Sequence, residues 1–113
     1  VGNGINVANS GQFGDGTSRS VIIEGNRIST ILNNPIPDPG YSPPSTIGNG
    51  IMVEQDCVVS GNLIENAARV GIQAGINSGA RDLVVTGNLV INAPIGIGVS
   101  NDAVSGSGRS VVV

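Results

Sequence analysis

The chain has 113 residues, a formal net charge of −3, no histidine, and five arginines as its only basic side chains. The lack of histidine excludes a Ser-His-Asp triad and a histidine-ligated metal, and the single cysteine, Cys57, excludes an internal disulfide or a CxxC metal site. The acidic charge and the two aromatic residues argue against nucleic-acid binding, and no apolar run has the length of a membrane span.

The predicted elements recur in a fixed order along the chain. Each repeat holds a β-branched strand, a Gly-Asn corner, a second short strand and a Gly-Ile strand, followed by a variable loop. The Gly-Ile strands occupy residues 4–7, 50–53, 71–74 and 96–99. The β-branched strands, each with its corner and second strand, occupy residues 21–28, 57–64 and 83–90, and a further copy begins at residue 111. Ile and Val dominate these segments because β-branched side chains suit a pleated surface.

Repeats of this length with Gly and Asn at the corners predict an all-β fold, a parallel β-helix (solenoid) of about four rungs. One domain covers residues 1–113, with a Pro-rich loop insertion at 33–47. Gly-Asn also marks β-hairpins, so an antiparallel sandwich is the alternative, although a sandwich does not need loops that recur in phase. Because the chain opens and closes within a motif, we expect it to be a fragment of a longer β-helix.

Alternation along the strands assigns the faces of the sheets. If Ile23, Val59 and Val85 point inward, then every other position that is predicted to point inward is also apolar. These positions include the isoleucine of each Gly-Ile strand, the last of which is Ile97. The same alternation places Ile22, Val58 and Val84 outward in one column, and Leu63 and Leu89 outward in another. An exposed apolar stripe of this kind predicts a covered face, so we expect remaining rungs of the same protein or a partner chain over Ile22, Val58 and Val84.

Three asparagines, Asn26, Asn62 and Asn88, follow glycine at the same phase of each repeat. Asparagine tolerates the left-handed backbone of a sharp corner, and its amide both donates and accepts hydrogen bonds. We therefore expect a structural asparagine ladder along the column. Asn66 and Asn92 recur at the next corner with the same interpretation.

Chemistry on such a scaffold is expected in the loops. Asp15, Glu54 and Asp56 are the candidates for acid and base work on a sugar, and a pair such as Glu54 and Asp56 also suits Ca²⁺. Tyr41, Asp38 and Asp102 are the candidates for ligand binding in the loops. Solvated loop acids with no ligand are the alternative for all of these carboxylates. A recurring arginine, present as Arg19, Arg81 and Arg109, is expected to pair with Asp82 and neighbouring loop acids rather than with a sugar carboxylate.

Several runs resemble a family of bacterial twin-arginine-translocated repeat proteins, itself similar to right-handed parallel β-helix proteins of the pectate-lyase-like superfamily. These runs are Gly-Asn-Leu-Ile-Glu-Asn-Ala (61–67), Arg-Asp-Leu-Val-Val-Thr-Gly-Asn (81–88) and Ala-Pro-Ile-Gly-Ile-Gly-Val-Ser (93–100). The resemblance implies a right-handed parallel β-helix and export to the periplasm or the cell exterior. The catalytic motifs of pectate lyases and related enzymes do not map onto this chain, which has no Asp-Pro-His-Asp motif.

We therefore expect a structural or carbohydrate-binding segment of an exported bacterial protein, with a polysaccharide as partner and no cofactor. The alternative is part of a polysaccharide-active enzyme, a lyase, epimerase or hydrolase, that uses the loop carboxylates. The lack of Lys and His favours the first interpretation.

Overall fold

The computed structural model describes residues 3–9, 20–32, 48–75, 81–100 and 109–113, and the structural statements below concern these residues. They form eleven strands and no helix. The strands are β1 (Ile5–Val7), β2 (Val21–Glu24), β3 (Arg27–Ile31), β4 (Ile51–Val53), β5 (Gln55–Ser60), β6 (Leu63–Ala67), β7 (Val70–Ala74), β8 (Arg81–Thr86), β9 (Leu89–Ile91), β10 (Ile95–Val99) and β11 (Arg109–Val112).

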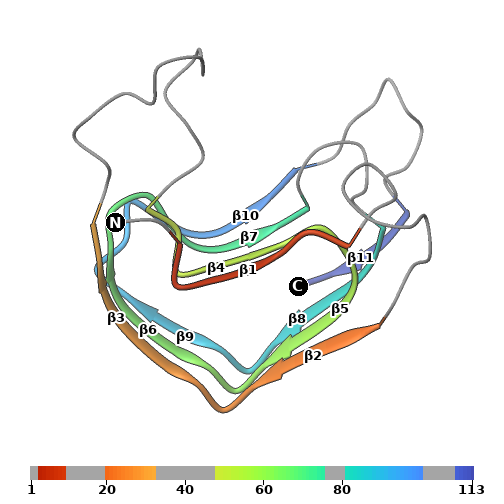
Figure 1. The fold of residues 1–113 in the computed structure, drawn as a ribbon, viewed down its shortest axis with the longest axis horizontal. Helices are drawn as coiled ribbons and strands as arrows, with labels where there is room; N and C mark the ends of the chain where they lie inside the picture. Colours follow the sequence, from red (N-terminus) through yellow and green to blue (C-terminus); the bar gives the residue numbers. More distant parts are fainter. Residues whose placement is uncertain (1–2, 10–19, 33–47, 76–80, 101–108) are drawn as a thin grey trace.

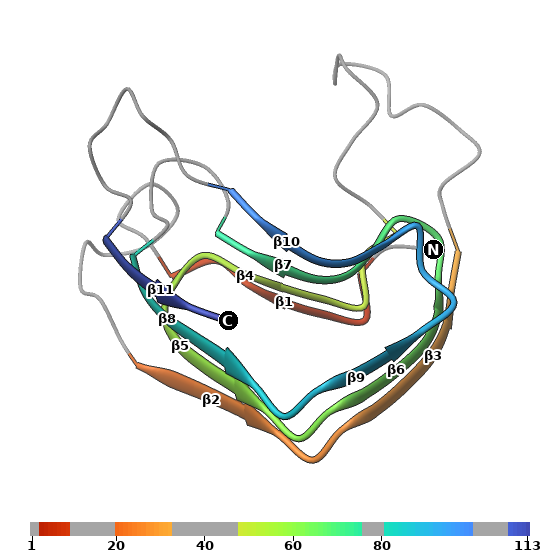
Figure 2. The same ribbon diagram turned by 180° about the vertical axis from the view of Figure 1, so that it is seen from behind.

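The strands form three parallel sheets that make up the three sides of a column (Figure 1). Sheet A has the order β1-β4-β7-β10, sheet B the order β11-β8-β5-β2, and sheet C the order β3-β6-β9. Consecutive strands lie in different sheets, and each strand pairs in parallel with its counterpart from the next repeat, as Figure 2 shows from behind. Antiparallel pairs, which the sandwich alternative needs, do not occur among the described strands. The architecture is all-β and is compatible with the predicted parallel β-helix.

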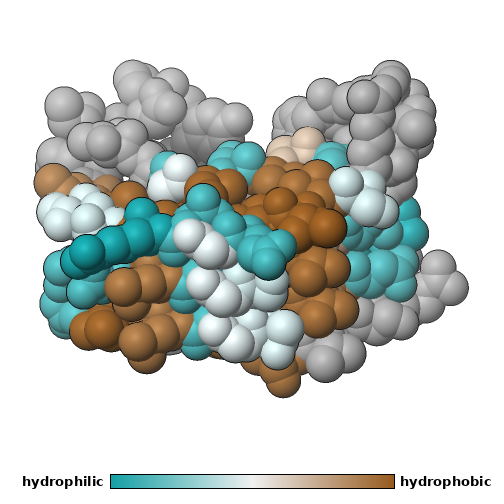
Figure 3. Space-filling view, turned by 90° about the horizontal axis from the view of Figure 1, so that it is seen from below, coloured by the Kyte–Doolittle hydropathy of each residue, from teal (hydrophilic) through white to brown (hydrophobic). Residues whose placement is uncertain are grey.

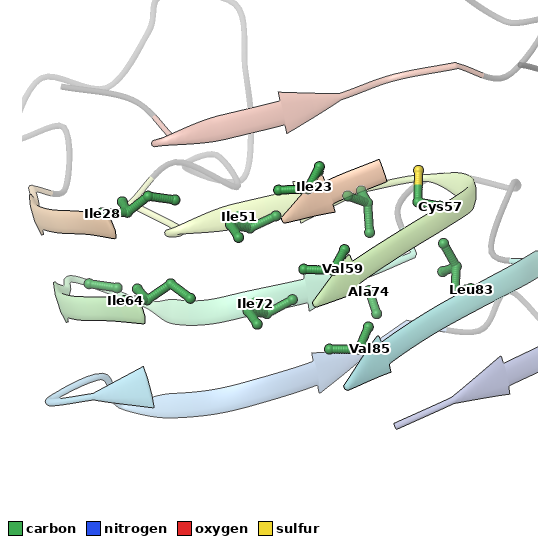
Figure 4. Packing of buried hydrophobic residues seen from close by; sticks show 12 residues of the cluster. Ile23, Ile28, Ile51, Cys57, Val59, Ile64, Ile72, Ala74, Leu83 and Val85 are labelled. Carbon is green, nitrogen blue, oxygen red and sulfur yellow. The ribbon is translucent and has the colours of Figure 1, made fainter. Parts of the chain in front are cut away.

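The core lies inside the column and consists of apolar side chains stacked one repeat above another. Ile23 is in register with Val59, and Val59 with Val85, and these side chains are 5%, 0% and 1% exposed. Figure 4 shows this row beside two others, Ile51 with Ile72 and Ile28 with Ile64. The predicted alternation is confirmed, because the neighbouring Ile22 is 69% exposed. Burial of these columns removes apolar surface from water and is the main favourable contribution to folding.

Ile97 departs from the predicted inward burial and is 37% exposed. Its register partner Ile72 is fully buried, although both have the same place in their strands. The difference arises because β10 is the last strand of sheet A and has a neighbour on one side only, whereas β7 lies between β4 and β10. Leu63 also differs, since it is half-buried where the pattern predicted an outward, exposed side chain.

The Gly-Asn corners carry hydrogen bonds that run along the column. The Asn26 amide nitrogen Nδ2 donates to Oδ1 of Asn62 at 3.0 Å, and Nδ2 of Asn62 donates to Oδ1 of Asn88 at 2.9 Å. The same Oδ1 atoms accept the backbone N–H groups of Asn26 and Asn62 at 3.0 and 2.9 Å. The corner is thus tied to its neighbours by both side chain and backbone.

A second polar column lies at the corner that follows sheet C. Thr30, Asn66 and Asn92 occupy equivalent positions in β3, β6 and just after β9, with φ angles of 59°, 59° and 58°. Asn92 donates from Nδ2 to Oδ1 of Asn66 at 2.8 Å. Asparagine adopts this left-handed backbone readily, whereas a β-branched threonine does so only with strain.

We expect the substitution Thr30→Asn to raise the free energy of unfolding by about 1 kcal/mol. The new side chain relieves the strained backbone and supplies an acceptor for Asn66. Urea denaturation of the variant measures the gain, and Ser29→Asn, at the exposed position one residue earlier in β3, is the control that should give none. Equal midpoints for Thr30→Asn and the unmodified chain would contradict this explanation.

Candidate functional site

Two of the predicted chemical residues, Glu54 and Asp56, lie at the corner where β4 of sheet A passes into β5 of sheet B. Asp15, Asp38, Tyr41 and Asp102 lie outside the described residues, as do the Pro-rich insertion at 33–47 and Arg19. The corner between sheets A and B is therefore the part of the predicted site that can be analysed.

Asp56 and Asp82 occupy the same position at this corner, one repeat apart, and both have left-handed backbones with φ of 50° and 51°. Arg81 joins them: one guanidinium nitrogen lies 3.2 Å from Oδ2 of Asp56, and the other lies 3.2 Å from Oδ2 of Asp82. The Asp56 carboxylate is the more buried of the two, with 16% of its side chain exposed. Because its partner comes from the next repeat, the ion pair fastens β5 to β8.

This arrangement favours a structural part for the corner acids over acid and base chemistry. Asp56 is engaged by Arg81, and Glu54 is fully buried with no surface open to a substrate. The guanidinium of Arg81 lies between the carboxylates of Asp56 and Asp82 and supplies a positive charge there. Within the described ranges, no group of three or more His, Cys, Asp or Glu side chains is placed to hold a metal ion.

Cys57 lies next to this corner but faces the core. It is 1% exposed, and its thiol donates to the backbone oxygen of Gln55 at 2.9 Å. Burial, followed by the negative charge of Asp56, raises the pKa of the Cys57 thiol from 9.0 to about 11. A thiol of this kind is protonated at neutral pH and is a poor nucleophile, which agrees with a packing role.

The raised pKa of Cys57 predicts a specific alkaline loss of stability. The folded thiol keeps its proton up to about pH 11, whereas the unfolded thiol loses it near pH 9. The contribution is therefore complete below pH 9 and falls as the pH rises toward 11. Comparing the pH dependence of the unfolding free energy for the unmodified chain and Cys57→Ala isolates the contribution of the thiol, since all other titratable groups are the same in both proteins. Parallel curves from pH 8 to 11 would show that the thiol is not shifted.

The outer face of sheet A is a second site, and it carries polar side chains that the predicted site omitted. Because Ile5, Val7, Ile72 and Ala74 belong to the core, the residues between them, Asn6 and Gln73, point outward. Figures 1 and 2 show the backbones of β7 and β10 bowed toward the other sheets. The sequence already contained the information that these side chains point outward. In each Gly-Ile strand, the outward residue is the one directly after Ile and before the next inward residue.

Gln73 is held in a defined orientation on this face. Its Nε2 donates to the hydroxyl oxygen Oγ of Ser100 at 2.8 Å and to the backbone oxygen of Gly75 at 3.1 Å. The side chain extends over Gly98, where an added Cβ would lie 2.8 Å from Oε1 of Gln73. Asn6 and Ser100 are exposed and Gln73 is partly exposed. Amide and hydroxyl groups of this kind both donate and accept hydrogen bonds, as sugar hydroxyls require.

The rest of this face is more enclosed. Asn49 donates from Nδ2 to Sδ of Met52 at 3.5 Å, which places both on the same side of the sheet, and they are 3% and 6% exposed. The accessible part of the face is therefore formed mainly by Asn6, Gln73 and Ser100.

Two further findings concern membrane-spanning helices and similarity to known proteins. The described residues include no helix of the length and apolarity needed to cross a membrane. A search with protein-family profiles, a search of curated proteins and a search of solved structures each give no match to the chain.

Proposed function

We propose that the chain is a segment of a right-handed parallel β-helix, of about four rungs, that binds a polysaccharide without transforming it. The observation that carries this proposal is the polar part of the outer face of sheet A, on which Gln73 and Ser100 are hydrogen bonded to each other at 2.8 Å and Asn6 is exposed. Asn6 and Gln73 hold the same position in β1 and β7, which are two strands apart, about 10 Å, with the buried Met52 of β4 between them. An extended chain of repeating sugars has hydroxyl groups to match such an array.

An exported bacterial location belongs to the same proposal. It is supported by the resemblance of the repeats at 61–67, 81–88 and 93–100 to twin-arginine-translocated repeat proteins. A polysaccharide outside the cytoplasm is a natural partner for a protein in the periplasm or on the cell exterior. The Gly-Asn corners and the asparagine ladder support the scaffold part of the proposal, because their hydrogen bonds tie successive repeats together at the same corner.

A polysaccharide array with the full chain tests the binding function. We expect retention on at least one polymer and a loss of about tenfold in affinity for Gln73→Ala, which removes two hydrogen bonds on the face. Ser29→Ala, on the outer side of sheet C, is the matched control and should bind as the unmodified chain does. Retention that is equal in both variants would move the binding site away from sheet A.

The same array distinguishes binding from catalysis. Polymers that bind should be recovered at their original chain length after incubation with the protein. Cleavage of a uronate polymer that is abolished by Glu54→Gln and Asp56→Asn would instead establish the enzyme alternative, with the corner acids as the reacting groups.

We also propose that a partner covers the outer face of sheet B, because a row of apolar side chains on that face is exposed. Ile22, Val58 and Val84 form one in-register row on the outer face of sheet B, and they are 69%, 37% and 36% exposed. Figure 3, which looks onto the side formed by sheets B and C, shows apolar surface there, interrupted by polar residues. Replacing Val58 and Val84 with threonine keeps the β-branched shape and removes apolar surface. An unchanged association state in sedimentation would refute a role for this row in assembly.

A further inference from the structure

We propose that the free edge of sheet C, along β9, is a docking site for one strand of another polypeptide, a segment with a Gly-Asn corner followed by an inward β-branched residue. Among the described strands, sheets A and B hold four each, whereas sheet C holds three. β10 and β11 continue their sheets one strand beyond the turn of β7, β8 and β9, and β9 is the outermost strand of sheet C (Figure 2). An uncovered strand edge presents backbone donors and acceptors to which an extended segment can add.

The space beside Gly96 indicates which side chain the added strand carries. In the three earlier repeats, a Cβ added to the equivalent glycine would meet a γ-carbon of a β-branched residue in sheet C. These pairs are Gly4 with Ile28, Gly50 with Ile64, and Gly71 with Val90. A Cβ added to Gly96 would meet no atom within 4 Å. Because the three β-branched residues are in register, a fourth strand in sheet C would place its own Ile or Val in the space beside Gly96.

Asn88 offers hydrogen bonds to the corner of the added strand. In the two earlier steps of the ladder, the backbone oxygens of Asn26 and Asn62 accept the N–H of the leucine that follows the next asparagine, at 2.8 and 2.9 Å. Their backbone N–H groups donate to Oδ1 of that next asparagine, at 3.0 and 2.9 Å. Asn88 is the last asparagine of the ladder in the described part of the chain, so an incoming Gly-Asn corner finds the same acceptor and donor there.

A single strand fits this edge better than a second copy of the whole column. A copy stacked end to end with its sheets aligned would place its β1 on β10 and its β2 on β11. Its β3 would then lie one strand too far along the column to contact β9, because sheet C is one strand shorter than sheets A and B. The edge of β9 would remain uncovered.

A labelled peptide with the sequence of residues 61–67, Gly-Asn-Leu-Ile-Glu-Asn-Ala, is the probe, because it copies a corner and a strand of sheet C. We expect saturable binding to the full chain in fluorescence anisotropy, with NMR shift changes at the amides of Leu89, Val90 and Ile91. The peptide with the substitution Ile64→Asp should bind at least about tenfold more weakly, because it would place a carboxylate in the apolar space beside Gly96.

Gly96→Ala distinguishes docking at this edge from binding elsewhere. Its Cβ takes the space that the incoming β-branched side chain would fill, so the affinity for the peptide should fall about tenfold, while the fold is kept because the Cβ meets no atom of the chain. Ser100→Ala, on the outer face of sheet A, is the matched control and should bind the peptide as the unmodified chain does.

Three results would overturn the proposal. They are equal affinity of the unmodified chain and Gly96→Ala, shift changes outside β9 and β10 only, and no saturable binding of the peptide. Self-association of the unmodified chain that Gly96→Ala abolishes, without binding of the peptide, would assign the edge to a second copy instead. Polysaccharide binding on sheet A is measured separately and does not depend on any of these outcomes.

Discussion

Replacing Gly50 with alanine is expected to lower the free energy of unfolding by about 3 kcal/mol or to prevent folding. A Cβ at this position would lie 2.6 Å from the backbone oxygen of Gly71 in the next repeat and 2.5 Å from Cγ2 of Ile64. Neither neighbour can withdraw easily, because the oxygen belongs to the backbone of β7 and Ile64 is a fully buried core residue. The close approach of successive turns at this corner thus requires glycine.

Gly96 provides the matched control for this prediction. It occupies the same column as Gly50, but an added Cβ would meet no atom within 4 Å. Gly96→Ala should therefore leave the unfolding free energy unchanged to within about 0.5 kcal/mol, or raise it slightly by restricting the unfolded chain. Urea denaturation of both variants makes the comparison. Similar losses in the two would mean that glycine is needed for its backbone freedom and not for the contact between turns.

Asn62→Ala is expected to cost about 3 kcal/mol of unfolding free energy, because it removes the central member of the asparagine ladder. Asn62 is 2% exposed, and besides its bond to Asn88 its Nδ2 donates to the backbone oxygen of Ile23 at 3.0 Å. Its Oδ1 accepts the backbone N–H of Asn26 at 3.0 Å. Truncation removes the acceptor of the Asn26 N–H and a donor to the Ile23 oxygen at a position that is closed to water.

Asn26→Ala is the comparison that tests the ladder. Asn26 is more exposed than Asn62, and its Nδ2 has one bond within the ladder, to Oδ1 of Asn62. Its loss should cost about 1 kcal/mol. Chemical denaturation of the two variants gives both values, and a larger loss for Asn26→Ala would contradict the assignment of Asn62 as the central residue.

The columns of stacked side chains could be predicted from the sequence because equivalent residues of the repeats can be aligned directly. Ile23, Val59 and Val85 hold the same place in three copies of one motif, and so do the three ladder asparagines. Parallel stacking in register then follows, since only that register keeps like residues together. Thr30 shows the limit of this reasoning, because aligning the repeats places it opposite Asn66, but the left-handed φ of 59° at both residues is visible only in the structure.

The candidate site was harder to predict because its contacts cross between repeats. The loop acids could be recognised, but the link from Arg81 to Asp56 joins residues 25 apart in the chain and depends on the left-handed backbone at Asp56 and Asp82. The burial of Glu54 likewise depends on its surroundings and not on its type. Gln73 was overlooked because its column mixes Asn, Met, Gln and Gly and shows no repeated chemical signature.

Parallel stacking of the repeats is the central claim, and spin labels placed in pairs test it most directly. Ser60 and Thr86 are register partners in β5 and β8, whereas Ser60 and Asp82 lie four positions out of register. With labels attached to cysteines in a Cys57→Ala background, parallel pairing predicts strong dipolar broadening for the Ser60 and Thr86 pair, whose strands are about 4.8 Å apart, and weak broadening for the Ser60 and Asp82 pair. Strong broadening for Ser60 with Asp82 and weak broadening for Ser60 with Thr86 would indicate antiparallel pairing and contradict the stacked column.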